Sequence, residues 1–388
     1  MIRVTNLSLF YSDRGKPVRA VDDVSFEVPE GIFYTLLGPS GSGKTSTLRC
    51  IAGLERPSSG EITLGNVVVV SGRKSVPTYR RDIGMVFQSY AVWPHMTVFE
   101  NVAFPLRVGR QRLRKPVIEE KVGRALALVG LSGYEGRGAT QLSGGQQQRL
   151  SFARALVREP QVLLLDEPLS NLDAKLRGRM RTELSLLQRR LGITTLFVTH
   201  DQIEALSMSD RVAVMNDGRI MQEGSPRTIY HRPESVFVAN FIGSTNLLSG
   251  EVIEGSAASS DEPVQASTSL GPIACTAWTD VKPGLPVVVT IRPEDVVVRY
   301  GAPDNGLPSR SSNTYEGRVD IGLFNGMTTD LRIRIGDEVI YAVAGSRLDV
   351  ERGDQVTVEL PAAACWLLPA DEHDKLDGEA SGRPTTPG

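Results

Sequence analysis

The eight residues GPSGSGKT, from Gly38 to Thr45, lie between an apolar run at 32–37 and a run with helical character at 47–52. Their spacing matches G-x-x-x-x-G-K-[ST], and a strand before the loop with a helix after it is the context in which this pattern binds phosphate. Glycines allow successive backbone N–H groups to converge on an anion, and the positive end of the helix adds to the attraction. This combination disfavours a flexible Gly/Ser turn. The loop predicts a nucleotide-phosphate site in which Lys44 supplies the cation and the Thr45 hydroxyl binds Mg²⁺.

Composition indicates a globular protein with more than one domain. The 388 residues correspond to two or three domains of roughly 150 residues each. A net charge of −2 gives no sign of a nucleic-acid-binding surface. No apolar run reaches the ~18 residues of a transmembrane helix and no signal-peptide pattern is present, so we expect a cytoplasmic protein. The three cysteines, Cys50, Cys275 and Cys365, lack metal-ligand spacing and are expected to be packing residues in a reducing compartment.

The first part of the chain, residues 1–240, alternates strand-like and helix-like runs. This pattern predicts an α/β domain with a mainly parallel sheet, helices on both faces and the nucleotide at the carboxyl ends of the strands. Within it, residues 89–141 are expected to form a helical insertion, because stretches such as 119–129 have amphipathic helical periodicity.

The second part, residues 241–370, is expected to form a small all-β, barrel-like domain. Short β-rich runs separated by Gly and Pro support this prediction, and they lie at 287–291, 296–298, 329–334 and 355–360. The Ser/Ala-rich segment 255–269 is expected to be a loop, and the polar residues 371–388 a disordered tail.

Two adjacent carboxylates, Asp166 and Glu167, end the apolar run 162–165. A buried strand here would deliver both to the nucleotide edge of the sheet. Asp166 would then hold Mg²⁺, while Glu167 would polarise the water that attacks the γ-phosphate. Alone, such a pair is more often a helix-capping or turn feature, and the phosphate loop is what favours the functional interpretation.

The segment Leu142–Gln146, LSGGQ, precedes a helix expected to begin near Gln147 and to run to Leu156. Its small residues would expose backbone N–H groups and the Ser143 hydroxyl at a helix N-terminus, which is a second anion-binding surface. Taken alone, the segment also fits a turn and an N-cap.

These motifs, in this order, resemble those of the ATP-binding subunits of ATP-binding-cassette (ABC) transporters over about the first 240 residues. The resemblance is carried by Gly38–Thr45, Gln88, Leu142–Gln146, Asp166, Glu167, Ser170–Asp173 and Thr199–Asp201. It implies an ATPase of the translocase class that uses ATP and Mg²⁺. It also implies a head-to-tail homodimer in which each ATP lies between one subunit's phosphate loop and the other's LSGGQ segment.

The resemblance also assigns roles to residues. Catalytic roles fall to Glu167, His200 and Lys44, and Mg²⁺ contacts fall to Thr45, Gln88 and Asp166. The implied ATP contacts are Tyr11, Gly38, Pro39, Ser40, Gly41, Ser42, Gly43, Lys44, Thr45, Ser46, Gln88, Ser143, Gly144, Gly145, Gln146 and Asp173.

Several of these residues also fit purely structural roles. Gln88 fits a polar strand end, and a lone histidine such as His200 is usually structural. Asp173, implied to act across the dimer interface, also fits an N-cap for a helix beginning at Ala174. Tyr11 resembles the aromatic residue that stacks on adenine, but Phe10 adjoins it, and either residue also fits a buried core aromatic.

Two segments resemble importers. Residues 89–98, with 100–102, resemble the segment that receives a coupling helix from the membrane subunit, although they also fit packing of the insertion. Ile291–Glu294, IRPE, resembles a motif of the transport-associated oligomer-binding domain of sugar, polyamine and iron(III) importers.

We therefore expect a peripheral ATPase on the cytoplasmic face of the plasma membrane that drives import through separate permease subunits. A solute-binding protein outside the membrane would be an indirect partner, and no nucleic acid is expected. The sequence around Trp93 resembles that of iron(III), polyamine and related importers more than that of sugar importers. The alternatives are a sugar importer, a soluble cassette ATPase acting on DNA or ribosomes, and a C-terminal region that mainly binds a regulatory ligand or partner.

Overall fold

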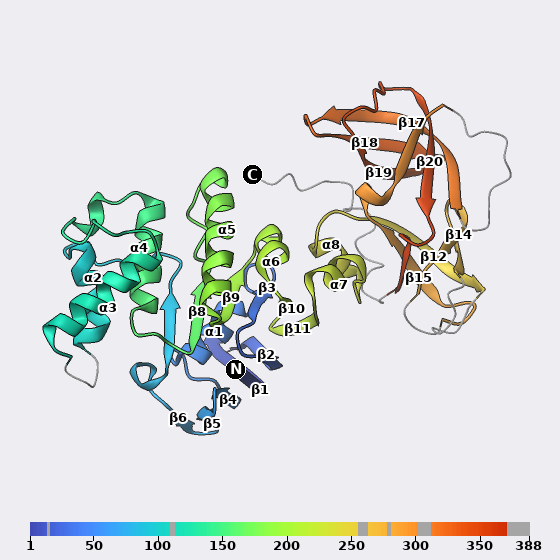
Figure 1. The fold of residues 1–388 in the computed structure, drawn as a ribbon. Coiled ribbons are helices and arrows are strands. Elements are labelled where there is room, and N and C mark those ends of the chain that lie inside the picture. The colour runs from blue at the N-terminus through green and yellow to red at the C-terminus, as the bar shows by residue number, and fades with distance from the viewer. Residues whose placement is uncertain (14–15, 109–112, 255–262, 278–280, 302–311, 371–388) are drawn as a thin grey trace. The chain divides into compact units, whose positions relative to one another are not determined.

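Figure 1 shows the fold of the protein in a computed structural model. The structure describes residues 1–13, 16–108, 113–254, 263–277, 281–301 and 312–370. The chain divides into two compact units, Met1–Pro226 and Arg227–Gly388. The boundary expected near residue 240 therefore falls inside the second unit, and the expected tail, 371–388, lies outside the described residues.

The first unit is built around a six-stranded sheet of order β11-β10-β3-β9-β8-β7. Neighbouring strands are parallel except for β10 and β11, which confirms the mainly parallel sheet. Every residue of β3, β8 and β9 is buried, as expected for strands covered on both faces. The bounds are β3 Phe33–Leu37, β7 Ile83–Val86, β8 Val162–Asp166, β9 Thr194–Thr199, β10 Arg211–Asn216 and β11 Arg219–Gly224.

Different layers cover the two faces of this sheet. Phe33, Leu165 and Phe197 face a core shared with α2 to α5, whereas their neighbours Tyr34, Leu164 and Leu196 face a core shared with α1. The expected helical insertion contains α2 and α3, seen beside α4 in Figure 1. The helices are α1 Lys44–Ala52, α2 Val98–Arg107, α3 Lys115–Leu128, α4 Gly144–Leu156, α5 Ala174–Leu191 and α6 Gln202–Met208, with 3-10 turns η1 Thr78–Arg80 and η2 Ala139–Gln141.

An antiparallel sheet also covers the α1 face, and the alternating pattern did not predict it. Its order is β2-β1-β4-β5-β6. Alternate residues of β1, such as Ile2 and Val4, are buried in the core shared with the central sheet. The strands are β1 Ile2–Asp13, β2 Lys16–Val28, β4 Ser59–Leu64, β5 Val67–Ser71 and β6 Lys74–Ser75.

The second unit begins with two short helices and continues as the expected all-β domain. Its two five-stranded antiparallel sheets, β14-β13-β12-β15-β21 and β16-β20-β17-β18-β19, enclose one hydrophobic core. The helices are α7 Pro226–His231, which begins at the unit boundary, and α8 Val236–Phe241, and η3 is Pro293–Asp295. The strands are β12 Asn246–Glu254, β13 Val264–Thr268, β14 Gly271–Cys275, β15 Pro286–Ile291, β16 Val297–Tyr300, β17 Ser312–Phe324, β18 Thr328–Ile335, β19 Glu338–Gly345, β20 Gln355–Pro361 and β21 Trp366–Pro369.

One sequence expectation in this domain is wrong in part. Residues 264–268 of the expected loop 255–269 form β13, which pairs with β12 and β14. Val264 and Ala266 alternate into the core, so the small side chains here belong to a strand. The rest of that loop up to residue 262 lies outside the described residues.

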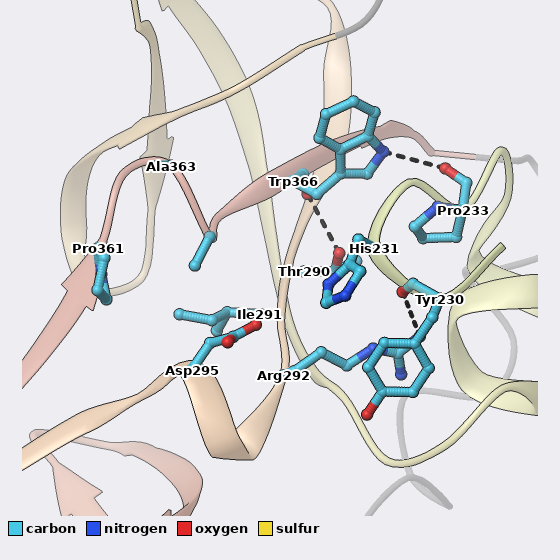
Figure 2. A pocket seen from close by; sticks show the side chains of 11 residues that line it. Tyr230, His231, Pro233, Thr290, Ile291, Arg292, Asp295, Pro361, Ala363 and Trp366 are labelled. Atoms are coloured by element: carbon cyan, nitrogen blue, oxygen red, sulfur yellow. Dashed lines mark hydrogen bonds between the residues drawn. The ribbon is translucent and has the colours of Figure 1, made fainter. Parts of the chain in front are cut away.

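Arg292 attaches the two short helices to the β-domain (Figure 2). This buried guanidinium donates to the backbone oxygens of Ala239, Ser244 and Tyr230 at 2.9, 2.9 and 3.1 Å. Nearby, Trp366 Nε1 donates to the Pro233 oxygen at 3.0 Å. These residues adjoin a pocket of about 380 Å³ that lies within the second unit.

Among the described residues, no helix is long and apolar enough to cross a membrane.

Candidate nucleotide-hydrolysis site

The glycine-rich loop connects the end of β3 to the start of α1, as its motif predicts. Lys44 Nζ lies within the loop and donates to the backbone oxygens of Gly38 and Pro39, both at 2.8 Å, and to Ser42 Oγ at 3.3 Å. A Cβ on Gly38 would lie 2.3 Å from the Met215 oxygen, so only glycine fits there. The loop thus holds its ammonium group in place at a helix N-terminus.

Two of the three side chains expected to bind Mg²⁺ meet beside this loop, while the third, Gln88, contacts Glu167 instead. Thr45 Oγ1 donates to Asp166 Oδ1 at 3.1 Å, which brings together residues from α1 and the end of β8. Burial raises the pKa of Asp166, an effect that the Thr45 hydrogen bond opposes. Burial also lowers the pKa of Lys44, while the carboxylates of Glu167 and Asp166 act in the opposite direction. A hydroxyl and a carboxylate are oxygen ligands of the kind that Mg²⁺ accepts.

Glu167 is the residue on which two other predicted residues converge. Its Oε2 accepts from Gln88 Nε2 at 3.2 Å, and its Oε1 lies 3.1 Å from His200 Nδ1. Glu167 has a φ of 43°, a rare left-handed conformation for this residue type, and its N–H donates to the Val198 oxygen at 3.0 Å. The left-handed backbone at Glu167 therefore ends the extended conformation of β8, and the carboxylate lies beside Gln88 and His200.

The LSGGQ segment opens α4, which begins at Gly144 and not near Gln147. Ser143 is the N-cap residue, so both glycines lie in the first turn of the helix. The Ser143 N–H donates to Gln146 Oε1 at 3.0 Å. Asp173 caps α5 by accepting from the Leu176 N–H at 2.9 Å. In the described part of the chain, neither Ser143 nor Asp173 hydrogen-bonds to the phosphate loop, so the single chain does not bring these predicted residues to it.

Tyr11 and Phe10 are both about two-fifths exposed, so neither is a buried core aromatic. The Tyr11 hydroxyl lies 3.4 Å from Oγ of Ser46 in α1 and donates to Glu55, which follows that helix. The Phe10 ring instead contacts the Arg19 guanidinium, which lies 5.9 Å from the ring centroid. Tyr11 is therefore the aromatic residue that adjoins the helix of the phosphate loop.

The segment after Gln88 is stabilised by Arg154, which sequence reasoning did not identify. Tyr90 and Ala91 both have positive φ, and Arg154 donates to their backbone oxygens, at 2.8 Å for Tyr90. Its guanidinium also lies 4.7 Å from the ring centroid of Trp93. Burial lowers the pKa of Arg154 to about 10. Sequence reasoning missed this residue because Arg154 lies 63 and 64 positions from the carbonyls that it binds.

Sequence reasoning also missed Arg177 and Glu204. Arg177 bonds to two loops beside Glu167, and Glu204, which is 2% exposed, accepts from Thr199 Oγ1 at 2.6 Å. The partners of Arg177 are two backbone carbonyls and Asp201, which is 24 positions away, so no local pattern signalled this residue.

Comparison with known families gives two matches. Residues 21–170 match the family model described as ABC transporter, and residues 289–368 match the model described as TOBE domain.

Relatives with curated names are import ATP-binding proteins. The chain is 44% identical over 373 residues to the trehalose/maltose import ATP-binding protein MalK of Thermococcus litoralis, covering 94% of this chain and 95% of that one. It is 40% identical to the spermidine/putrescine import ATP-binding protein PotA of Thermotoga maritima, covering 88% and 89%. The PotA protein of Rubrobacter xylanophilus is 55% identical over 66% of this chain and 65% of its own length, slightly less than two thirds.

A solved structure supports the fold. The structure described as a dimeric bacterial ABC transporter cassette is 32% identical, with a TM-score of 0.53, over 58% of this chain and 99% of its own.

Proposed function

We propose that this chain, which belongs to the ATP-binding subunits of ABC importers, hydrolyses ATP to drive import of a solute. The protein is an ATPase. The observation that carries the proposal is the convergence of Gln88 and His200 on Glu167, with side-chain distances of 3.2 and 3.1 Å. A carboxylate bordered by an amide and an imidazole, next to a phosphate loop, has the chemistry needed to orient an attacking water.

Each residue has a separate role in this proposal. Lys44 and the loop N–H groups bind the β- and γ-phosphates, and Tyr11 stacks on the adenine. Glu167 polarises the water, while His200 hydrogen-bonds the γ-phosphate and Gln88 links the site to the helical insertion. Thr45 and Asp166, whose oxygens are 3.1 Å apart, hold Mg²⁺ with Gln88 nearby. When bound, the metal neutralises the charge that develops on the phosphates.

The site is completed by a second copy of the chain. Ser143 and Gly144 lie at the N-terminus of α4, away from hydrogen-bonding contact with the loop of their own chain. In a head-to-tail homodimer, this helix start supplies N–H groups to the other subunit's ATP, and Asp173 lies across the interface. The similarity to a dimeric cassette structure supports a dimer.

The subunit drives transport by docking on separate permease subunits at the cytoplasmic face of the membrane. The segment around Trp93 is the proposed receiving surface, because its ring packs on Phe104 with 4.5 Å between centroids and is held by Arg154. The sequence favoured iron(III), a polyamine or a related solute, with a sugar as an alternative. The relatives' names favour a polyamine or a sugar among these. Co-purification with integral membrane proteins tests this role against that of a soluble cassette ATPase.

The substitution Glu167→Gln tests the catalytic proposal. It keeps the shape but removes the base, so we expect near-normal ATP affinity with hydrolysis slowed by about 10²–10⁴-fold. The stalled protein should accumulate as an ATP-bound dimer, which size-exclusion chromatography would measure. Turnover within a few-fold of the parent would assign the catalytic role elsewhere.

Two matched variants complete the experiment. Asp166→Asn should lose Mg²⁺-dependent ATP binding and form no such dimer, because the metal loses its carboxylate ligand. Ser143→Arg, added to Glu167→Gln, should leave ATP binding to the monomer intact but prevent the dimer. A dimer that persists in this double variant would contradict the head-to-tail arrangement.

A further inference from the structure

Arg177, in the first half of α5, contacts two loops that flank the candidate site. Its Nη2 donates to the backbone oxygens of Leu172 and Ser170 at 3.2 and 3.5 Å. Its Nη1 donates to Asp201 Oδ2 at 3.3 Å. We call residues 168–173 the distal loop and residues 199–201 the switch loop. One guanidinium therefore holds the two loops at a fixed separation.

Both loops return to Glu167. The distal loop does so through Ser170, whose Oγ donates to the Glu167 backbone oxygen at 2.9 Å. The switch loop does so through His200, whose Nδ1 lies 3.1 Å from Glu167 Oε1. Arg177 thus closes a ring of contacts that includes both the backbone and the carboxylate of Glu167.

The switch loop is also tied to α6 by a buried carboxylate. Glu204 accepts from Thr199 Oγ1 at 2.6 Å, and its N–H donates to Asp201 Oδ1 at 3.0 Å. Arg177 Nε lies 3.9 Å from Glu204 Oε1, so one cation faces two carboxylates. The side chain of Glu204 is only 3% exposed, so this end of the ring is buried.

The contacts of Arg177 favour a geometric role over a stabilising one. Its side chain is 32% exposed, and ion pairs with this exposure contribute little to stability. A planar guanidinium, however, directs several donors in fixed directions. Here those donors reach carbonyls of one loop and a carboxylate of the other, which an ammonium group cannot reproduce at once.

We propose that Arg177 is a positioning residue for ATP hydrolysis, which holds the distal and switch loops so that Glu167 faces the attacking water while His200 faces the γ-phosphate. The inference rests on the proposed role of Glu167. Arg177 itself does not touch the nucleotide and acts only through the two loops.

The first test compares Arg177→Ala and Arg177→Lys with the parent. Misplacement of catalytic groups by about an ångström costs on the order of 10²-fold, so we expect kcat to fall about 10–100-fold for Arg177→Ala. The KM for ATP and the affinity for ATP should stay within about threefold, because the phosphate loop is unaffected. Arg177→Lys should recover only part of kcat.

Arg179→Ala is the matched control, because Arg179 is an exposed arginine on the same helix. It should leave kcat unchanged. Thermal unfolding of each variant separates a folding defect from a kinetic one, and Arg177→Lys retains the charge if Arg177→Ala does not fold.

The second test asks whether Arg177 acts through Glu167. If it does, Arg177→Ala should lower the activity of Glu167→Gln by less than threefold, because residues that act as a unit are not additive. Glu167→Gln alone reports on the proposed function, so the failure of that proposal is distinguishable. Effects that multiply in the double variant, an unchanged kcat in Arg177→Ala, or full recovery by Arg177→Lys would overturn the inference.

Discussion

Gly38 occupies a position where any side chain would collide with the backbone. A Cβ there would lie 2.3 Å from the Met215 oxygen and 2.6 Å from Ser42 Oγ. Because the first obstacle is backbone, the loop itself would have to move. Its carbonyl is also one of the acceptors that hold Lys44.

We expect Gly38→Ala to lose most ATP affinity, with nucleotide binding measured by calorimetry. Gly123→Ala is the matched control, since Gly123 lies inside α3 and a Cβ there would meet nothing within 4 Å. That change should preserve ATP binding and raise the free energy of unfolding by about 0.5–1 kcal/mol. Normal ATP affinity in Gly38→Ala would show that the loop relaxes to accept a methyl group.

Among the elements, α7 and α8 are both attached to the β-domain by the side chain of Arg292. Burial lowers the pKa of Arg292, whose guanidinium donates to three backbone oxygens. The Tyr230 ring lies 4.5 Å from it. Removing the donors leaves these carbonyls without their partner in a buried region.

Arg292→Met should therefore lower the free energy of unfolding of the second unit by about 2–4 kcal/mol. Chemical denaturation followed by tryptophan fluorescence measures this, because Trp366 packs beside α8. Arg299→Met is the control: Arg299 pairs with Glu359 at 3.1 Å on an exposed strand and should cost less than about 1 kcal/mol. Equal losses in the two variants would contradict a specific attachment role for Arg292.

At the scale of the whole molecule, the cysteines can be used to follow the unfolding of each unit. Cys50 belongs to the first unit, while Cys275 and Cys365 belong to the second, and all are buried. Burial raises the pKa of each thiol to about 12, from an ordinary value of 9.0. Because the reactive form is the thiolate, the folded protein should resist alkylation at pH 8.

We expect alkylation only when the unit that contains a given cysteine unfolds, and mass spectrometry of peptides labelled during heating would assign each site. The pH dependence has a definite sign. Folding raises the pKa of each thiol, so its contribution to the free energy of unfolding is fully present below about pH 9. That contribution is lost as pH rises towards 12, because only the unfolded thiols ionise at first. Rapid labelling of Cys50 at pH 8 in unheated protein would contradict its burial.

The sequence by itself determined the class of fold and most of the residues at the candidate site. The loop from Gly38 to Thr45 and the pair Asp166-Glu167 were predictable because their signals are local: a motif, a strand pattern and a loop. The parallel sheet followed from strand and helix alternation, and the all-β domain followed from short runs such as 355–360. Local rules of this kind need no knowledge of distant residues.

Only the tertiary structure decided how those residues meet. The antiparallel sheet, the strand at Val264–Thr268 and the attachment of α7 and α8 depend on pairing between distant segments, which propensity does not encode. The same reason explains why Arg154 and Arg177 were missed: each acts through backbone carbonyls, and a carbonyl has no sequence signature. The contacts of Glu167 with Gln88 and His200 span 79 and 33 positions, so packing of the sheet creates them.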